Sequence, residues 1–594
     1  MSRLRFIYII LAGMTGVIWA GRRGRRGREK RTVPHDIWPA PQHVSCGARD
    51  DDALVLVDAS TFSVEFSPQS AAQSSVRLQA AMDRAQKKVL SQPMRLTRGL
   101  DEPQFTFPSD DDDSTAARRL REGSLRLGTV LVTVAGDEPD GAPPPALADD
   151  ESYSLFFASD GDPAATLTLS LSAASVWGAL HGLETLAQLV RADGVVPGGR
   201  GLRIDDAPRY PWRGLLLDTS NHYLPMAQLL TFLDAMATVK MNVLHWHIVD
   251  SYSFPFQSAT FPGLAAYGAW TKEAVYSADD VARVVAYAAD RAIRVVPEFD
   301  VPGHAYSWGL SPALASITVD CPAYADGLGH VDDVPLDPTN DLTYNVVRGV
   351  LSDAAAAFPD AFLHLGGDEV QYGCWNYSRG VQQWLAEHDG SSMVDLENVF
   401  FGETTAHLSS LGKKQLVWEE VFFKDSEWVP SPVLQANKTI VETWTGPEYL
   451  LVATSNGYDA ILAYGWYLDR QTPVDGEVAW GWLDSWSQMY LVEPEPLSEM
   501  PPQEKKGAAS TATVGRVLGG EASLWSEQVD AVNALVQAWP RASAVAERLW
   551  SPRNVTDLAD AARRLAGLRC RMLHWHGVTS APIWSDWCSA SAAP

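Results

Sequence analysis

Cysteine is scarce in this chain, which has only five among 594 residues. None of the five stands in a Cys-x-x-Cys spacing, and this argues against a zinc finger or a thioredoxin-type redox site. In a secretory protein such cysteines pair by default. An odd number leaves at least one thiol free or bonded to another molecule.

Basic residues are also in deficit, because 47 Lys and Arg face 73 Asp and Glu, for a net charge of −26. An acidic surface repels phosphate backbones, so we expect no nucleic-acid partner. Apolar residues are not scarce, at 46% of the chain, which excludes a mostly disordered protein. At about 150 residues per domain, the length alone predicts two to four domains.

Long hydrophobic runs are few, and the N-terminal one is short. Residues 6–20 are apolar and follow Arg3 and Arg5. A run of about 15 residues is shorter than the about 20 that a membrane span needs. It therefore favours a cleaved secretory signal. The basic stretch 22–31 leaves two other interpretations open, a processed pro-segment and a short membrane anchor.

Removal of residues 1–31 would make the chain more acidic. This leader holds nine Lys and Arg and one acid, so 38 basic and 72 acidic residues remain, for a charge of −34. Protonation of carboxylates in an acidic compartment would relieve the self-repulsion. We expect the secretory pathway, ending in a lysosome, a vacuole or the medium. Predicted glycosylation sites agree with this route, at Asn376, Asn437 and Asn554.

Residues 32–205 are predicted to form a small α+β domain. Four segments rich in apolar and β-branched residues are typical of strands, at 53–67, 124–136, 152–158 and 165–172. Residues 173–191 place their apolar side chains on one helical face. The acidic run Asp110–Asp113 is predicted to be a solvated loop, because a calcium loop needs spaced ligands and a turn glycine.

Residues 206–594 show a different pattern, in which short apolar runs end in polar or aromatic residues. Continuous apolar strands joined by helices indicate a parallel α/β sheet. Eight such runs predict a (β/α)₈ TIM barrel, so the fold class is α/β, with a barrel preceded by the small α+β domain. Helices are expected at 278–292, 542–550 and 558–575, and an exposed insertion at 501–515. The eight runs are 214–220, 242–250, 293–304, 361–369, 415–422, 439–446, 458–469 and 517–527.

The ends of these runs carry the candidate chemistry, because a TIM barrel gathers its active site at the C-terminal ends of its strands. Carboxylates and aromatic side chains dominate there. Aromatic rings offer faces for sugar C–H groups, and carboxylates accept hydrogen bonds from hydroxyls or perform acid–base chemistry. The ends therefore predict a carbohydrate-processing pocket. They carry Asp250, His304, Asp368, Glu369, Trp418, Glu419, Trp444, Trp466, Tyr467, Asp469, Trp525 and Glu527.

The segment His364–Glu369, HLGGDE, is the most informative of these ends. Two glycines let the backbone leave the strand along a tight path, and two adjacent carboxylates follow. Like charges this close raise one pKa, which keeps one carboxylic acid protonated. The alternative is a solvated Asp-Glu pair at a turn. The position after a buried strand favours function.

A metal site and a serine nucleophile are the competing chemistries. Strand alternation places His245 and His247 on one face, as in metal-dependent barrel hydrolases. The later strand ends supply no histidine after His364, so we favour buried, hydrogen-bonded imidazoles and expect no metal or other cofactor. No Gly-x-Ser-x-Gly elbow occurs, which disfavours a serine hydrolase.

Several long motifs resemble the β-N-acetylhexosaminidases of glycoside hydrolase family 20, and most closely their lysosomal type. The similarity runs from about residue 54 to residue 588, and the helix within 173–191 is similar to the small N-terminal domain of that family. The motifs are RGLLLDTSNHYLP (213–225), MNVLHWHIVDSYSFPFQS (241–258), PEFDVPGH (297–304), HLGGDEV (364–370), WYLD (466–469) and WPRASAVAERLW (539–550).

The resemblance implies an exo-acting, retaining enzyme that removes terminal non-reducing β-linked N-acetylglucosamine or N-acetylgalactosamine from glycoproteins, glycolipids or chitooligosaccharides. Catalysis in that family is substrate-assisted, since the 2-acetamido oxygen attacks the anomeric carbon. By resemblance, Glu369 is the general acid and then the base, and Asp368 holds the acetamido N–H. Asp250 and His304 would form a relay that orients Glu369. The alternative from another class is a non-catalytic sugar-binding protein that kept the pocket.

The resemblance also implies which residues contact the sugar. Trp418, Trp444 and Trp525 would surround the acetyl methyl group, and Tyr467 would hydrogen-bond the acetamido oxygen. The outer hydroxyls would be bound by Arg213, Asp469 and Glu527. Arg213 starts a predicted strand, so the barrel pattern places it at the end of the barrel opposite the predicted pocket. Only the resemblance supports its assignment to the sugar site.

This chain also departs from the family pattern. Many relatives have Asp-Asp where this chain has Asp250-Ser251. Arg470 follows Asp469, a combination that would admit a sulfated sugar or an anionic aglycone. Family pairing implies the disulfides Cys321–Cys374 and Cys570–Cys588, with Cys46 unpaired. A homodimer is expected from the relatives.

Overall fold

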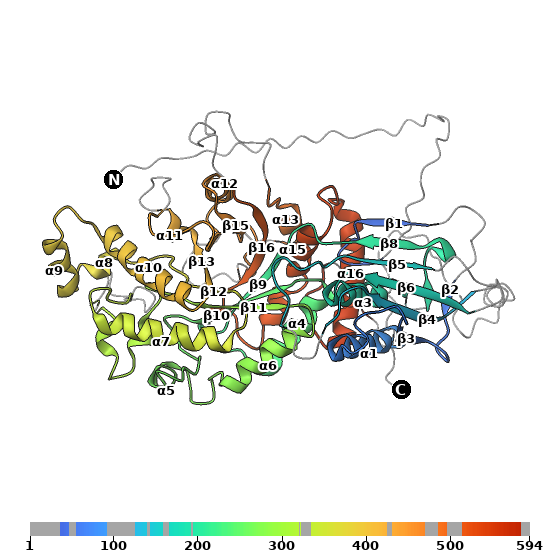
Figure 1. The fold of residues 1–594 in the computed structure, drawn as a ribbon, viewed down its shortest axis with the longest axis horizontal. Coiled ribbons are helices and arrows are strands. Elements are labelled where there is room, and N and C mark those ends of the chain that lie inside the picture. Colours follow the sequence, from blue (N-terminus) through green and yellow to red (C-terminus); the bar gives the residue numbers. More distant parts are fainter. Residues whose placement is uncertain are drawn as a thin grey trace.

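The structure of the chain, a computed structural model, shows a sheet unit beside a closed barrel (Figure 1). Four predicted features lie outside the described residues: the leader 1–31, the acidic run Asp110–Asp113, most of the insertion 501–515, and Arg470. The described residues are 36–46, 55–91, 125–138, 143–157, 166–191, 194–319, 321, 334–423, 431–469, 485–495, 514–583 and 588.

The N-terminal unit is one mixed sheet whose strand order is β1-β8-β5-β6-β4-β2-β7, with β3 paired to β4. All four predicted strand segments are present, and the first contains two strands. The strands are β1 (His43–Ser45), β2 (Val55–Val57), β3 (Ser63–Phe66), β4 (Leu125–Val134), β5 (Tyr153–Phe157), β6 (Leu167–Ala173), β7 (Val195–Val196) and β8 (Arg203–Asp206).

Two helices pack on this sheet, α1 (Val76–Leu90) and α3 (Val176–Leu189). Helix α3 is the one that the sequence predicts. Helix α1 has no counterpart among the predicted elements, although the Ser75 side chain caps it by accepting from the Leu78 N–H. Alternating buried residues in β5 and β6 face the helices, which gives this unit its own hydrophobic core.

Eight parallel strands close into a barrel in the order β10-β11-β12-β13-β14-β15-β16-β9. Each of the eight predicted runs contains or overlaps one of them, so the predicted fold class is confirmed. The strands are β9 (Trp212–Asp218), β10 (Val243–Val249), β11 (Arg294–Phe299), β12 (Phe362–His364), β13 (Lys414–Trp418), β14 (Thr439–Thr443), β15 (Asp459–Leu462) and β16 (Val517–Leu524).

The helices around the barrel are uneven in length, as the short gaps in the sequence suggest. Helix α12 fits nine residues into the gap after β14. The described part of the connection from β15 to β16 contains only the short helix α13. The helices are α4 (Met226–Thr238), α5 (Gly263–Gly268), α6 (Ala278–Ala289), α7 (Asp341–Ala357), α8 (Tyr372–Trp375), α9 (Arg379–Glu387), α10 (Met393–Ser410), α11 (Glu419–Phe422), α12 (Pro447–Ser455), α13 (Trp486–Leu491), α14 (Ala534–Ala538), α15 (Arg541–Trp550) and α16 (Leu558–His576), with 3₁₀ turns η1 (Gly199–Gly201), η2 (Tyr306–Gly309) and η3 (Ala315–Ile317).

The barrel interior changes character along its axis. Apolar side chains close its N-terminal end, contributed mainly by the first residues of the strands, such as Trp212, Val243 and Phe362. Nearer the C-terminal end the interior holds buried histidines and glutamates, such as His245 and Glu298. This polarity directs the chemistry toward one end of the barrel.

Buried charges join the two units. Lys240, which follows α4, donates to Asp206 at the end of β8 at 2.9 Å. The Trp550 indole, at the end of α15, donates to the same carboxylate at 3.0 Å. Figure 1 shows α16 between the barrel and the N-terminal sheet, where its Arg571 donates to the Gln188 carbonyl at 3.0 Å.

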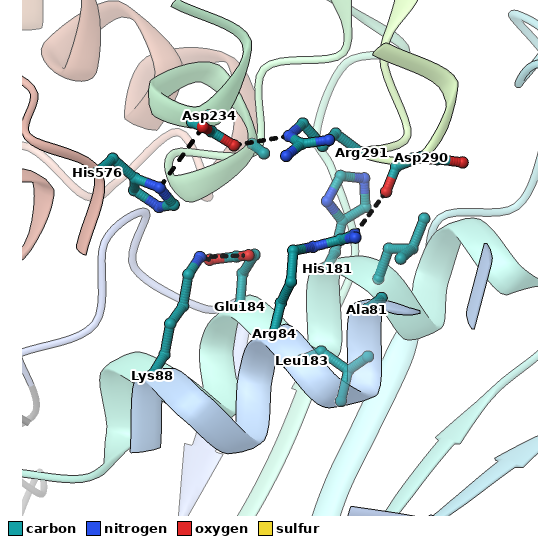
Figure 2. Close-up of a pocket in the computed structure, with 12 residues that line it drawn as sticks. Ala81, Arg84, Lys88, His181, Leu183, Glu184, Asp234, Asp290, Arg291 and His576 are labelled. Atoms are coloured by element: carbon teal, nitrogen blue, oxygen red, sulfur yellow. Dashed lines mark hydrogen bonds and ion pairs between the residues drawn. The ribbon is translucent and has the colours of Figure 1, made fainter. Parts of the chain in front are cut away.

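The interface also contains a cavity of about 20 Å³, room for roughly one water molecule. Its charged lining is already paired, as Figure 2 shows. Lys88 contacts Glu184 at 2.7 Å, and Arg291 contacts Asp234 at 2.7 Å. The Arg84 guanidinium donates to the Asp290 carbonyl at 2.7 Å. The cavity is therefore part of the interface rather than a substrate site.

The implied cysteine pairs are present, since Cys321 bonds Cys374 and Cys570 bonds Cys588, and Cys46 is free. The three predicted glycosylation sites, Asn376, Asn437 and Asn554, are exposed. Among the described helices, none combines the length and the apolar character that crossing a bilayer requires.

Candidate active site

Two glycines form the turn that carries the paired carboxylates beyond β12. Gly366 and Gly367 have φ of 64° and 93°, a region that glycine enters without a Cβ penalty. A Cβ on Gly366 would overlap Asp300, and one on Gly367 would overlap Val421. The Gly367 N–H donates to the Asp300 carboxyl at 2.8 Å, which fixes the turn. The tight path predicted from the sequence is therefore present.

The four predicted catalytic residues meet at this turn. His304 Nδ1 lies 3.4 Å from Asp250 Oδ1. His304 Nε2 lies 3.7 Å from Glu369 Oε2 and 3.9 Å from Asp368 Oδ2. Both His304 and Glu369 have positive φ, 47° and 49°. Strained backbone of this kind gathers at active sites, where the surrounding structure holds it in place.

The two carboxylates differ in exposure. The Glu369 side chain is 55% exposed and Asp368 only 13%. Asp368 Oδ1 is buried and has no hydrogen-bond partner among the described residues. Glu369 can therefore reach a leaving group at the mouth, while Asp368 offers an acceptor inside the pocket.

The electrostatics of the site follow from the His304 imidazolium. Although burial alone would lower it, the Asp250 carboxylate holds the pKa of His304 well above its usual value. The nearby His304 imidazolium lowers the pKa of Glu369. Burial, supported by the charges of Glu298 and Glu369, raises the pKa of Asp368 to about 6. The two adjacent carboxyls therefore differ in acidity, with Asp368 the weaker acid and Glu369 the stronger.

An aromatic cluster lies near the C-terminal ends of the barrel strands. It contains Trp418, Trp444, Tyr467 and Trp525, together with Leu216 and Ala463. The Trp418 and Trp525 rings lie 6.1 Å apart, and Trp444 and Tyr467 lie 6.2 Å apart. The structure thus brings together the four aromatic residues that the resemblance implies.

Two further carboxylates mark the polar side. Glu527 follows β16, and Asp469 follows β15. Desolvation and the nearby charges of Asp218 and Asp469 raise the pKa of Glu527 to about 8. A protonated Glu527 can both donate to and accept from a sugar hydroxyl.

The assignment of Arg213 to the sugar site is wrong. Its side chain is fully buried near the N-terminal end of β9, and its guanidinium pairs with Glu151 of the N-terminal unit. It also donates to the carbonyls of Lys240 and Tyr210, at 2.8 Å each. The barrel pattern, which places strand starts away from the pocket, was the better guide.

Sequence reasoning missed several polar residues beside the site. Asn221 is buried after β9 and donates to Asp218 at 2.7 Å, and its Oδ1 has no partner among the described residues. Asp300 is buried after β11, where burial and the Asp368 charge raise its pKa well above the usual value. Glu420 accepts from the Trp444 indole at 2.9 Å. All three lie within or beside quoted motifs, and the signal was their polarity at buried positions.

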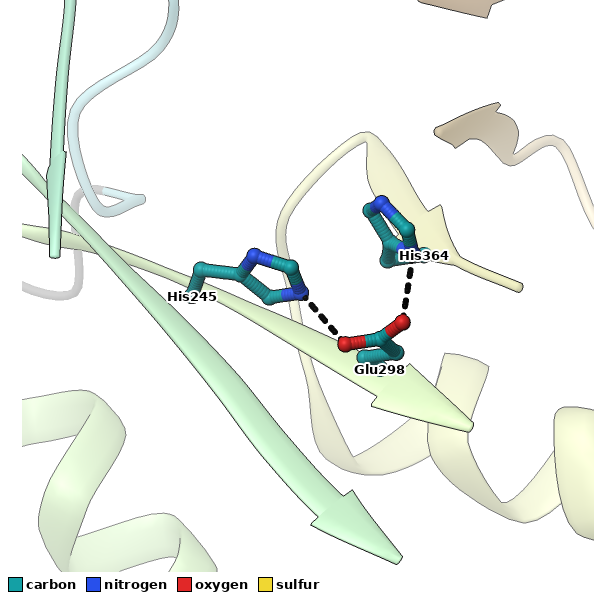
Figure 3. Close-up of side chains that lie close together, drawn as sticks. All are labelled: His245, Glu298 and His364. Carbon is teal, nitrogen blue, oxygen red and sulfur yellow. Dashed lines mark ion pairs between the residues drawn. The ribbon is translucent and has the colours of Figure 1, made fainter. Parts of the chain in front are cut away.

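Three groups among the described residues are close enough to hold a cation. Figure 3 shows His245, Glu298 and His364. His245 contacts a glutamate through each ring nitrogen, and His364 Nδ1 accepts from the Gly366 N–H. A second group, His245 with Glu442 and Glu521, shares that histidine. The third group, Asp300 with His304 and Asp368, contains two of the proposed catalytic residues. The expectation that the chain uses no metal stays a prediction.

Comparison with known proteins agrees with this geometry. The family model "Glycosyl hydrolase family 20, catalytic domain" matches residues 210–553, and "beta-acetyl hexosaminidase like" matches residues 37–189. The chain is 38% identical over 559 residues to beta-hexosaminidase subunit beta of Mus musculus, covering 93% of each protein. It is 39% identical over 451 residues to the same subunit of Homo sapiens, covering 75% of this chain and 74% of that protein. The structure of a chitobiase from Flavobacterium johnsoniae is similar, with a TM-score of 0.70 and 27% identity over 92% of this chain and 73% of that one.

Proposed function

The chain belongs to glycosyl hydrolase family 20, and from that membership we propose how its residues perform the reaction. It is a glycosidase that removes terminal non-reducing β-linked N-acetylglucosamine or N-acetylgalactosamine from glycans. The reaction is substrate-assisted and proceeds with retention at the anomeric carbon. The roles of single residues are the proposed part.

In the first step the acetamido oxygen attacks the anomeric carbon and the glycosidic C–O bond breaks. Glu369 gives its proton to the departing oxygen, so a free alcohol leaves and the glutamate becomes anionic. Asp368 Oδ1, buried and without a partner among the described residues, accepts the acetamido N–H. Its negative charge stabilises the oxazolinium that forms.

In the second step water opens the oxazolinium. Glu369, now a carboxylate, takes one proton from water while the water oxygen bonds to the anomeric carbon. The N-acetyl group is restored and Glu369 is protonated again. The Asp250–His304 pair holds Glu369 in place through both steps, at 3.4 and 3.7 Å.

The walls of the pocket account for the choice of sugar. Trp418, Trp444 and Trp525 surround the acetyl methyl, and Tyr467 donates to the acetamido oxygen. Apolar rings that enclose a small methyl group favour N-acetyl sugars over sugars with a free 2-hydroxyl. Asp469 and Glu527 bind the outer hydroxyls.

One observation carries this proposal: an exposed carboxyl and a buried, unpartnered carboxyl oxygen flank one imidazole beside an aromatic wall. The test is hydrolysis of an aryl β-N-acetylglucosaminide. We expect Glu369→Gln to lower kcat by about 10³-fold and Asp368→Asn by about 10²-fold or more. Glu387→Gln, an exposed acid on α9, is the matched control and should match wild type.

A folded wild-type protein that does not hydrolyse this substrate would contradict the catalytic proposal and leave a sugar-binding protein. An oxazoline-mimicking inhibitor that fails to bind active enzyme would contradict the substrate-assisted step. Both measurements need circular dichroism beside them to show that each variant is folded.

We propose further that residues 1–31 are a cleaved leader, that residues 32–205 and 206–594 are the two domains, and that the enzyme reaches a lysosome, a vacuole or the medium as a homodimer. Two disulfides and relatives named as hexosaminidase subunits support this. N-terminal sequencing and light scattering of the secreted protein test it. Arg470 is proposed to admit sulfated substrates, and an undetectable rate on a 6-sulfated aryl substrate would contradict that role.

A further inference from the structure

A chain of alternating carboxylates and imidazoles runs through the barrel interior. It starts at Glu521 on β16, whose Oε1 lies 2.6 Å from His245 Nδ1. His245 Nε2 then lies 3.0 Å from Glu298 Oε2 on β11. The first three members therefore lie within four neighbouring strands of the barrel, on β16, β10 and β11.

The same chain continues to the catalytic residues. Glu298 Oε2 lies 2.5 Å from His247 Nδ1, and His247 Nε2 lies 2.9 Å from Asp250 Oδ2. The other oxygen of Asp250 faces His304, which in turn faces Glu369. The proposed acid is thus the last member of a series that begins in the barrel core.

The chain consists of buried charges. The side chains of Glu521, His245, Glu298 and His247 are at most 1% exposed. Each imidazole lies between two carboxylates. Both nitrogens of His247 are hydrogen-bonded, whereas His245 is hydrogen-bonded through Nδ1 and faces Glu298 through Nε2 at 3.0 Å. Burial alone would lower the pKa of both histidines. The charges of Glu521 and Glu298 nevertheless raise the pKa of His245 to about 9. Those of Glu298 and Asp250 raise the pKa of His247 well above its usual value.

We propose that His247 and Glu298 are positioning residues for the reaction: they hold the Asp250 carboxylate ionised and aligned with His304, and through that pair they set the charge state of Glu369. This inference rests on the proposed function of Glu369. Apolar side chains normally fill the interior layers of a TIM barrel. Buried ion pairs in their place are a weak source of stability, so a role in positioning explains them better.

Other titratable groups face the chain from the neighbouring elements. The edge of Trp525 packs on His247 with ring centroids 4.8 Å apart, and the Trp418 indole donates to Glu298 at 2.8 Å. These contacts cover the centre of the chain with apolar surface. The titratable groups that face the chain are His364 at the end of β12, Glu442 on β14, Asp300 after β11, Asp368 and Glu369 after β12, and Glu527 after β16.

Glu442 provides a matched control. It is fully buried in the same layer, 3.4 Å from His364 Nε2 and 3.8 Å from His245 Nδ1. Burial and the Glu521 charge raise its pKa well above the usual value. Neither of its carboxyl oxygens has a hydrogen-bond partner among the described residues. Glu442→Gln keeps the shape of a side chain that lies outside the chain of contacts, whereas Glu298→Gln removes a carboxylate from that chain.

The effect of Glu298→Gln on pH dependence has a definite sign. Without that carboxylate His247 loses its proton more easily, and a neutral His247 stabilises the Asp250 anion less. Asp250 then takes up a proton at a higher pH, and its link to His304 is lost. The acid limb of the kcat/KM profile therefore moves upward, because the active form needs an ionised Asp250.

The experiment is the pH profile of aryl β-N-acetylglucosaminide hydrolysis by wild type, Glu298→Gln and Glu442→Gln. We expect Glu298→Gln to lower kcat about tenfold with little change in KM and to move the acid limb up by about one pH unit. Glu442→Gln should stay within twofold of wild type. Equal, unshifted profiles for folded Glu298→Gln and Glu442→Gln would overturn the inference.

If the Glu298→Gln variant does not fold, a second measurement on the wild-type protein tests the inference without an activity assay. The ¹⁵N shifts of the imidazoles in folded wild type report their protonation. We expect His245 and His247 to stay doubly protonated at pH 7.5, and a neutral His247 there would overturn the inference. An inactive wild type would instead contradict the proposed function, so the two failures are distinguishable.

Discussion

His304 controls the charge of the proposed acid at the residue scale. Its imidazolium lies 3.7 Å from Glu369 and lowers the pKa of that carboxyl. A lower pKa of Glu369 moves the upper pH limit of its protonated, active form downward. This agrees with an acidic chain whose self-repulsion eases as carboxylates are protonated.

Replacement of His304 by Asn therefore makes a prediction about pH. Asn tolerates the positive φ of this position, so the backbone is kept. Without the cation the pKa of Glu369 rises, its protonated form persists to higher pH, and the basic limb of kcat/KM moves upward while the maximal rate falls about 10²-fold. Profiles of wild type and variant with one aryl substrate measure this, and a downward shift of the basic limb would contradict it.

The turn after β12 is the decisive piece at the element scale. Its sequence, two glycines before two acids, predicted a tight exit from a buried strand. The structure adds the reason, since the space that a Cβ on Gly366 would need is taken by Asp300. Short-range patterns of this kind are readable from sequence, because the backbone requirement lies within a few residues.

Gly366→Ala is expected to lower activity at least 100-fold. The new Cβ would push Asp300 away and turn Asp368 and Glu369 out of line, and misplacement by about 1 Å can cost 10²-fold. Gly412→Ala is the matched control, because Gly412 also has positive φ, 74°, with open space around it. It should cost about 1–2 kcal/mol of stability and leave kcat unchanged. Equal activity of the two variants would refute the steric argument.

The whole molecule shows what sequence reasoning could and could not reach. The barrel was predictable because each of its strands is a continuous apolar run ending in polar residues. Helix α1 was missed, although its buried apolar residues recur at helical spacing, at Leu78, Ala81, Met82, Ala85 and Val89. The chain through Glu298 and Glu521 was also missed, because contacts between strands far apart in sequence depend on barrel register. Arg213 was misplaced for a related reason: its partner, Glu151, lies in the other unit.

The pair of Arg213 and Glu151 leads to a prediction about stability in acid. Burial alone would raise the pKa of Glu151. Arg213 and His181, whose Nε2 lies 2.7 Å from Glu151 Oε2, outweigh burial and lower this pKa from 4.5 to about 2. A depressed carboxyl pKa contributes stability that is fully present above pH 4.5 and is lost as pH falls through 2. At about 1.4 kcal/mol per unit, the contribution is roughly 3 kcal/mol near neutrality and about half of that at pH 3.

Calorimetry of wild type and Glu151→Gln should therefore show the largest difference in Tm at pH 5 to 7 and a difference about half as large at pH 3. Because the pair lies near the N-terminal end of the barrel, the folded variant should keep the wild-type KM for the aryl substrate. Arg213→Met should behave alike, destabilised but with an unchanged KM. If Arg213 bound the sugar, the folded Arg213→Met variant would instead have a raised KM. That result would contradict the structural placement of Arg213 at the interface of the two units, where it pairs with Glu151.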